Sequence, residues 1–406
     1  MALDAEVTVD FPACLAADFT RELPRAERAV DRVLAAIDAA ESFKPLEDRS
    51  PGLRGNDWSN YLRCSEARMV RVIRFLERHG VTGGRLLDYG AYFGNFALMF
   101  REMGFEVDAV DAYQDYMPSL QPVVSLLGQQ GIGVMDFARV GRNLAGLEPG
   151  RYDVVLCMGV IEHVPHTARV LLEPLSRVLK PGGMLLMDTP NLVQLANRQK
   201  LARGESVWPP IAIQYPAEVP FEGHHREYTV EEMVWMTEAA GHDVLGVDLY
   251  NYSVYGQPRL KGRDASNHWR MIANPAMREL VMVASRKPAA GQDRRPGVDW
   301  RTVFDDTERY WHARMPAQVT EESESGILAA ETMVADLQSG VNQRDHMLQE
   351  LQAQHHAQHQ AFTTELIARD KAYAELMDRL GAAQYAFDMT PVERLKRAVR
   401  RWTGRS

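Results

Sequence analysis

Between residues 81 and 288 the chain alternates between near-continuous apolar runs and stretches that carry apolar residues at helical spacing. Short runs of this kind are typical of strands buried on both faces of a parallel sheet. Because the strands alternate with helices, the pattern predicts an α/β fold: a seven-stranded, mostly parallel sheet with helices on both faces. The predicted strands are 85–89, 106–112, 132–137, 152–157, 184–189, 242–250 and 279–287.

Residues 1–80 precede this region and are predicted to form an N-terminal helical segment. Apolar residues recur at intervals of three and four in 20–43 and again in 59–79, as in helices with one buried face. Within the region 81–288, residues 190–227 are rich in proline and aromatic residues and are not periodic. An insertion of this length in a compact domain is usually a lid or a substrate-binding segment.

The composition becomes that of a linker at 289–319, and residues 320–388 then contain no proline and mostly helix formers. Apolar residues in 320–388 follow a heptad repeat with one four-residue stutter, which predicts a long C-terminal helix that forms a coiled coil between copies of the chain. The alternative is a single solvated helix that packs on its own domain, because polar residues interrupt the seam. These interruptions are Arg344, His355, Gln358 and Arg369.

The last segment, 389–406, is predicted to be a basic amphipathic helix. Its apolar residues share one face, and basic residues fill the rest of the helix. This composition is typical of helices that lie in the interface of an anionic membrane. An RNA-binding or merely solvated tail has the same composition, so both remain alternatives. The apolar residues are Val392, Leu395, Val399 and Trp402, and the basic ones are Arg394, Lys396, Arg397, Arg400 and Arg401.

Composition narrows the class of protein. The chain has 406 residues and a net charge of −9, which argues against nucleic acid as the partner of the whole chain. Cys14, Cys64 and Cys157 are isolated, so neither a disulfide framework nor a zinc motif is indicated. The N-terminus is acidic, and no apolar run approaches the ~20 residues that a membrane-spanning helix needs. We expect a cytoplasmic protein that attaches peripherally to the inner membrane.

Candidate chemistry begins at the first strand, which ends at Asp88 and turns through Gly90 and Gly94 into a helix. Glycines at such a turn let a ligand approach the backbone closely. Asp111 ends the second strand, where a carboxylate can accept hydrogen bonds from ribose hydroxyls. Asp136, followed by Phe137, ends the third strand and could border a base. The set suits a ligand with an amino acid, a ribose and a base but no phosphate.

At these positions the sequence resembles the class I S-adenosylmethionine-dependent methyltransferases, whose fold is a Rossmann-like sheet. The resemblance covers roughly residues 85–287 and includes the D-x-G-x-x-x-G turn, the segment YDVVLCMGVIEHV and the LKPGG hairpin. Tyr92 stands where this turn usually has its middle glycine. The resemblance implies S-adenosyl-L-methionine as the cofactor, bound by Asp88, Tyr89, Gly90, Gly94, Asp111, Ala112, Asp136, Phe137 and Cys157.

Two further residues are candidates for the chemistry near the cofactor. His163 follows the fourth strand and is a candidate general base for a hydroxyl acceptor, or else a histidine that caps a helix or closes a pocket. Arg63 is a candidate partner for the cofactor carboxylate, or else a solvated arginine. No metal is expected, because the spacing of His163, His166, Asp188 and His224 matches no compact metal motif.

The segment EGHHREYT resembles a segment of methyltransferases that act on bacterial glycans. The resemblance implies that His224, His225, Arg226 and Tyr228 contact the substrate; the alternative is a hydrogen-bonded helix cap.

The sequence thus predicts an S-adenosylmethionine-dependent methyltransferase that O-methylates a sugar hydroxyl of a lipid-linked or nucleotide-linked surface glycan at the cytoplasmic membrane face. One alternative is a quinol or small-metabolite O-methyltransferase. Another is a non-catalytic, cofactor-binding scaffold that recruits glycan-assembly enzymes through its coiled coil. The predicted partners are the glycan substrate, an anionic membrane at 390–402 and further copies of the chain.

Overall fold

The computed structural model describes residues 11–37, 57–165, 167–217, 223–253, 262–292, 297–308, 317–388 and 391–404. It consists of two compact units, Met1–Ile327 and Leu328–Ser406.

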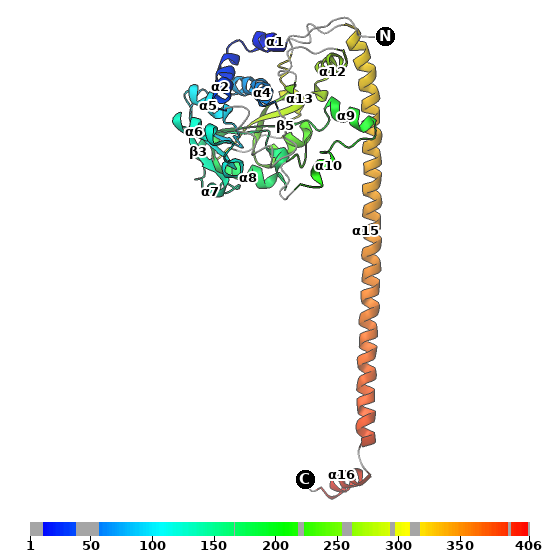
Figure 1. The fold of residues 1–406 in the computed structure, drawn as a ribbon. Coiled ribbons are helices and arrows are strands. Elements are labelled where there is room, and N and C mark those ends of the chain that lie inside the picture. Colours follow the sequence, from blue (N-terminus) through cyan, green and yellow to red (C-terminus); the bar gives the residue numbers. More distant parts are fainter. Residues whose placement is uncertain are drawn as a thin grey trace. The chain divides into compact units, whose positions relative to one another are not determined.

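The first unit is built around one sheet (Figure 1). This sheet has seven strands in the order β3-β2-β1-β4-β5-β7-β6. Neighbouring strands from β3 to β5 are parallel, whereas β7 runs antiparallel to both β5 and β6. The predicted seven-stranded, mostly parallel sheet is therefore confirmed. The strands are β1 (Arg85–Tyr89), β2 (Glu106–Asp111), β3 (Gly133–Asp136), β4 (Tyr152–Met158), β5 (Leu179–Pro190), β6 (Asp243–Tyr250) and β7 (Leu280–Arg286).

Helices cover both faces of this sheet, as predicted. In the first unit they are α1 (Phe11–Asp18), α2 (Leu23–Ala36), α4 (Trp58–Arg78), α5 (Asn95–Glu102), η2 (Tyr113–Tyr116), α6 (Gln121–Gln129), α7 (Phe137–Val140), η3 (Ile161–His163), α8 (Arg169–Val178), α9 (Leu195–Ala202), α10 (Ile211–Gln214), α11 (Val230–Ala239), α12 (Gly262–Ala273), η5 (Pro275–Met277) and α13 (Trp300–Val303).

The core is divided by the sheet because successive strand residues point to opposite faces. Leu86 and Val154 point to one face, where they are buried with residues of α2, α4 and α5. Leu87 and Val155 point to the other face, where they are buried with residues of α8 and α11. The N-terminal helices thus belong to the core of the sheet domain.

Part of the predicted linker 289–319 is packed into the same domain, which corrects the sequence interpretation. The backbone amide of Asp305 donates to the carbonyl of Val247 at 2.9 Å, and Glu308 is buried. Glu308 lies 3.3 Å from the guanidinium of Arg71, a side chain that is itself buried and that also pairs with Asp248 at 3.3 Å. Glu308 of this stretch, together with Asp248 of β6, therefore neutralises a buried arginine.

A long helix, α15 (Ala317–Asp388), has 72 residues and begins near the predicted position. At ~1.5 Å per residue it is roughly 110 Å long. It is followed by α16 (Pro391–Thr403), which lies within the predicted basic amphipathic helix 389–406. The long C-terminal helix is confirmed, and its pairing with another copy stays a prediction. Among the described residues, no helix is long and apolar enough to cross a membrane.

Candidate active site

The glycine turn that follows β1 has the geometry that the sequence predicts. Gly90 and Gly94 have φ angles of 75° and 66°, in the left-handed region that favours glycine. A Cβ on Gly90 would overlap the side chain of Val160. Tyr92 also has a positive φ, of 44°, and its backbone amide donates to Asp111 at 2.7 Å. Asp111, at the tip of β2, therefore fixes the backbone of Tyr92, which stands where this turn usually has its middle glycine.

Asp88 is the buried acid near the end of β1, just before this turn. Burial and the neighbouring Asp111 raise the pKa of its carboxyl group to about 7. Its Oδ2 atom has no hydrogen-bond partner among the described residues. A buried carboxylate oxygen without a partner is costly unless a ligand supplies a donor or a positive charge. This observation fits the ammonium group and sulfonium of S-adenosyl-L-methionine.

The other two predicted carboxylates are fixed by backbone amides. Asp111 accepts from the amide of Ala112 at 2.6 Å, and burial raises its pKa to about 6. Asp136 accepts from the amides of Gln114 and Ala138, both at 2.7 Å. These contacts orient the two carboxylates at the strand tips, where ribose and base would lie in the predicted arrangement.

Aromatic rings lie beside these tips. The rings of Tyr89 and Phe137 have centroids 5.1 Å apart, and the guanidinium of Arg142 lies 5.4 Å from the Phe137 centroid. Cys157 is fully buried in the core cluster on this side of the sheet, and burial raises the pKa of its thiol. Its position is thus that of a packed core residue.

Arg63 is paired with two carboxylates, so its contact with the cofactor stays a prediction. Its guanidinium pairs with Asp31 of α2 and, at 2.7 Å, with Glu66. Arg68, five residues further along α4, lies beside the active-site edge instead: a Cβ on Gly159, the residue after β4, would be 3.1 Å from an Arg68 Nη atom. Arg63 and Arg68 thus contact different parts of the domain from the same helix.

Asp188 anchors Arg68 and was also missed as a site residue. It is fully buried at the end of β5 and lies 2.6 Å from Arg68 Nε. It accepts from the amide of Gly159 at 2.7 Å and from the hydroxyl of Tyr250 at 2.6 Å. Its place at a strand tip, like those of the other three carboxylates, is the signal that could have identified it.

A cluster of Glu162, His163 and His224, called the histidine cluster below, lies just beyond β4. The rings of His163 and His224 are nearly perpendicular, with centroids 4.9 Å apart, and the His163 side chain is exposed. Glu162 is buried, burial raises its pKa to about 7, and its Oε2 has no hydrogen-bond partner among the described residues. Burial lowers the pKa of His224, but Glu227, 3.1 Å from its Nδ1, together with the charge of Glu162 produces a net increase.

The segment that contains His224 is held in place by hydrogen bonds and an ion pair. The amide of His225 donates to the Glu162 carbonyl at 2.7 Å, which fixes the segment against η3. Asn197 of α9 donates to the second carboxylate oxygen of Glu227 at 2.9 Å. Arg226 pairs with Glu232. Of the residues proposed to contact substrate, His224 therefore lies in the histidine cluster.

Tyr228 and its neighbours belong to the start of α11. Tyr228 is buried in the core, with the Arg226 guanidinium 5.2 Å from its ring centroid. Thr229 and Glu232 form a reciprocal capping box at the N-terminus of α11. The structure thus favours the helix-cap interpretation for Arg226 and Tyr228.

The histidine cluster also bears on the prediction that no metal is bound. Each of its three side chains offers one ligand atom, and these atoms lie within 4.8 Å of one another. They could hold a divalent ion, an arrangement that the spacing argument missed because His224 is 61 residues from His163 along the chain. His166 lies outside the described residues, and Asp188 is paired with Arg68.

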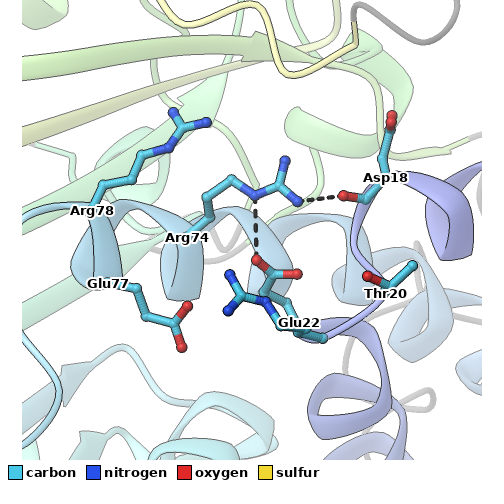
Figure 2. Close-up of a pocket in the computed structure, with 7 residues that line it drawn as sticks. Asp18, Thr20, Glu22, Arg74, Glu77 and Arg78 are labelled. Atoms are coloured by element: carbon cyan, nitrogen blue, oxygen red, sulfur yellow. Dashed lines mark hydrogen bonds and ion pairs between the residues drawn. The ribbon is translucent and has the colours of Figure 1, made fainter.

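A polar pocket between the α1–α2 region and α4 lies apart from the glycine turn (Figure 2). Arg74 donates to the carbonyl of Asp18 and, at 3.4 Å, to Glu22. Arg25 and Glu77 form another ion pair, at 3.0 Å. Because Glu22, Arg74 and Glu77 are engaged in ion pairs between these helices, this pocket is best explained as part of the N-terminal helix packing. Its lining residues are Asp18, Thr20, Arg21, Glu22, Arg74, Glu77 and Arg78.

Comparisons with known proteins agree with this geometry. Residues 61–247 match the family described as "Methyltransferase domain". The chain is 31% identical over 156 residues to the ubiquinone biosynthesis O-methyltransferase of Pseudomonas aeruginosa, a match that covers 38% of this chain and 57% of that protein. It is 32% identical over 123 residues to the enzyme of the same name from Xanthomonas oryzae pv. oryzae, a match that covers 30% of this chain and 49% of that protein. The chain thus spans about half the length of these relatives.

A solved structure of a SAM-dependent methyltransferase from Archaeoglobus fulgidus is 16% identical, with a TM-score of 0.35, and covers 53% of this chain and 93% of that chain. A TM-score of this size carries no argument by itself. The family match, however, spans the glycine turn, the strand tips and the histidine at position 163. We conclude that this part of the chain is a class I S-adenosyl-L-methionine-dependent methyltransferase domain.

Proposed function

We propose that the protein methylates a hydroxyl group and that His163 removes the proton from it. S-adenosyl-L-methionine, when bound, supplies a methyl group on a good leaving group. The protein must then orient the acceptor oxygen and accept its proton. His163 is the observation that carries this proposal: it is an exposed histidine directly after β4, at the edge that also bears the glycine turn and Arg68.

The surroundings of His163 suit a base. The His224 ring packs edge-on against it, and Glu227 holds His224 through Nδ1. Negative charge near an imidazole favours its protonated form, and Glu227 supplies such a charge to the ring that packs against His163. The buried Glu162 adds a second carboxyl group beside the two rings.

The acceptor that we propose is a sugar hydroxyl on a lipid-linked glycan at the cytoplasmic membrane face. The insertion after β5 exposes large apolar side chains. Because β5 ends at the sheet edge that carries the candidate active site, these side chains support an acceptor with an apolar part. Ile211 is 71% exposed and Tyr215 87%, and Leu201, Trp208 and Ile213 are also exposed. Five large apolar side chains exposed within residues 201–215 support a contact surface in this segment. The basic C-terminal helix would place such an enzyme at the membrane.

A quinol is the second candidate acceptor. The observation that favours it is the 31% identity to relatives named ubiquinone biosynthesis O-methyltransferases. A phenolic hydroxyl is more acidic than a sugar hydroxyl, so it makes a smaller demand on a base. The exposed apolar insertion is compatible with the isoprenoid part of such a substrate.

The test uses the full chain with methyl-labelled cofactor and three acceptor sets: lipid-linked oligosaccharides, nucleotide sugars and demethylated quinols. Label in the oligosaccharide fraction, lost in His163→Ala, supports the proposal. Label confined to the quinol fraction would replace the glycan acceptor with the second candidate. Cofactor binding without transfer to any set would favour a non-catalytic scaffold and overturn the proposal. His79→Ala, a change at the C-terminal end of α4, is the matched histidine control and should retain activity.

A further inference from the structure

The second unit ends in a helix whose apolar face is exposed. In α16, Leu395 is 67% and Trp402 90% exposed, and Val392 and Val399 on the same face are also exposed. These residues are spaced by three and four, so they form one stripe along the helix. A tryptophan at the end of such a stripe is typical of helices that lie at a membrane interface.

The charge of α16 is opposite to that of the rest of the chain. The helix carries five basic residues and one acidic residue, a net charge of +4, although the whole chain carries −9. The basic side chains flank the apolar stripe. This segregation matches a surface that is anionic and offers an apolar layer beneath it.

The neighbouring helix, α15, has its own exposed stripe. Leu348, Leu351, Phe362, Leu376 and Leu380 are all exposed, and each falls on the seam of the heptad repeat. A seam that keeps this spacing over several heptads is buried most simply by the same seam of a second copy. The occupant that the repeat favours is therefore another copy of this chain.

We propose that α16 docks in the plane of an anionic phospholipid surface and that pairing of α15 brings two or more copies of α16 to the same surface. A single short helix with four apolar residues binds weakly and reversibly. Joining two copies makes the second contact effectively intramolecular, so the paired chain binds much more tightly than either helix alone. This inference does not rest on the proposed methyl transfer, since a chain without transferase activity would still bind.

The experiment is co-sedimentation of the full chain with vesicles of phosphatidylcholine alone or with one third phosphatidylglycerol. Wild type should bind the anionic vesicles, bind the neutral ones at least tenfold more weakly, and dissociate as salt is raised. Truncation after Asp388 should abolish binding. Arg401→Glu should weaken it at least fivefold, whereas the charge-matched change Lys371→Glu on α15 should not.

The contribution of the apolar stripe is tested separately. Leu395→Gln with Val399→Gln keeps every charge, so it should abolish vesicle binding while leaving any purely electrostatic RNA binding intact. Pairing is tested by sedimentation equilibrium: Leu376→Ser with Leu380→Ser should give monomers and weaken vesicle binding at least tenfold. Ile367→Ser, also exposed but off the seam, should do neither.

Equal binding by the truncated chain, or binding that survives loss of the apolar stripe, would overturn the membrane assignment. A chain that stays monomeric at all concentrations, or monomers that bind vesicles as tightly as wild type, would overturn the role of pairing. Vesicle binding and pairing are both measured without methyl transfer. A negative result in these measurements is therefore distinct from failure of the proposed function.

Discussion

Replacing Asp88 with asparagine tests the role of the buried acid in the glycine turn. In the cofactor-free protein, the pKa of this carboxyl group rises from 3.8 to about 7, chiefly because the group is buried. The folded state therefore binds the proton more tightly than the unfolded state does. Stability is unaffected by this group below pH 4 and is lost progressively as the pH rises from about 4 to 7.

At pH 8 this pKa difference lowers the free energy of unfolding by about 4 kcal/mol, since each pKa unit is worth 1.36 kcal/mol. The asparagine amide must itself be buried, which offsets part of the gain. We therefore expect Asp88→Asn to raise the free energy of unfolding by about 1 to 3 kcal/mol at pH 8 and by almost nothing near pH 4. Urea unfolding of the cofactor-free protein at both pH values measures this difference.

The same substitution should weaken cofactor binding. A charge-assisted hydrogen bond contributes about 1.5 to 3 kcal/mol, so calorimetry should show S-adenosyl-L-methionine binding about ten- to hundredfold more weakly. Asp153→Asn is the control, because Asp153 is paired with Lys180 on the same sheet and its pKa is lowered despite partial burial. It should lose stability and bind the cofactor normally. A destabilised Asp88→Asn variant with unchanged cofactor affinity would refute the reasoning.

Four other predictions follow from the described contacts. Arg71→Met should lower the free energy of unfolding by about 3 to 5 kcal/mol in urea titrations, because it leaves Asp248 buried without its cation; a loss below 1 kcal/mol would contradict this. His163→Ala should lower kcat about 10²- to 10⁴-fold while calorimetry shows unchanged cofactor binding; a wild-type rate would exclude the base role. Glu227→Gln should lower the pKa of His224, measured by NMR titration of its ring protons; an unchanged pKa would show that Glu227 does not hold it raised. Micromolar Zn²⁺ should inhibit methyl transfer by occupying the histidine cluster, and chelators should leave methyl transfer intact. Activity that is lost on chelation and restored by a divalent ion would instead make the cluster a functional metal site.

The sheet and the three acidic strand tips could be predicted because both depend on local sequence. A short apolar run defines each strand, and the residue at its end is placed at the edge of the sheet whatever the partner strands are. Asp88, Asp111 and Asp136 were found in this way. Asp188 follows the same rule, since it lies near the end of β5.

The remaining site residues depend on contacts between distant segments. Arg63 and Arg68 lie on one helix, and periodicity alone does not tell which face of α4 meets the strand tips and which meets Asp31. His163 and His224 meet only because the segment before α11 returns to η3. Residues 297–308 have the composition of a linker, and only the folded chain shows that Glu308 faces a buried arginine.

The most direct test of the central claim is the atom that receives the methyl group. The full chain, methyl-labelled S-adenosyl-L-methionine and a total membrane extract are incubated, and the labelled product is identified by mass spectrometry for wild type and for His163→Ala. A methyl ether on a hydroxyl oxygen, formed by wild type and almost absent with His163→Ala, is the predicted result. Methylation of nitrogen, or an ether formed equally well without His163, would contradict the account.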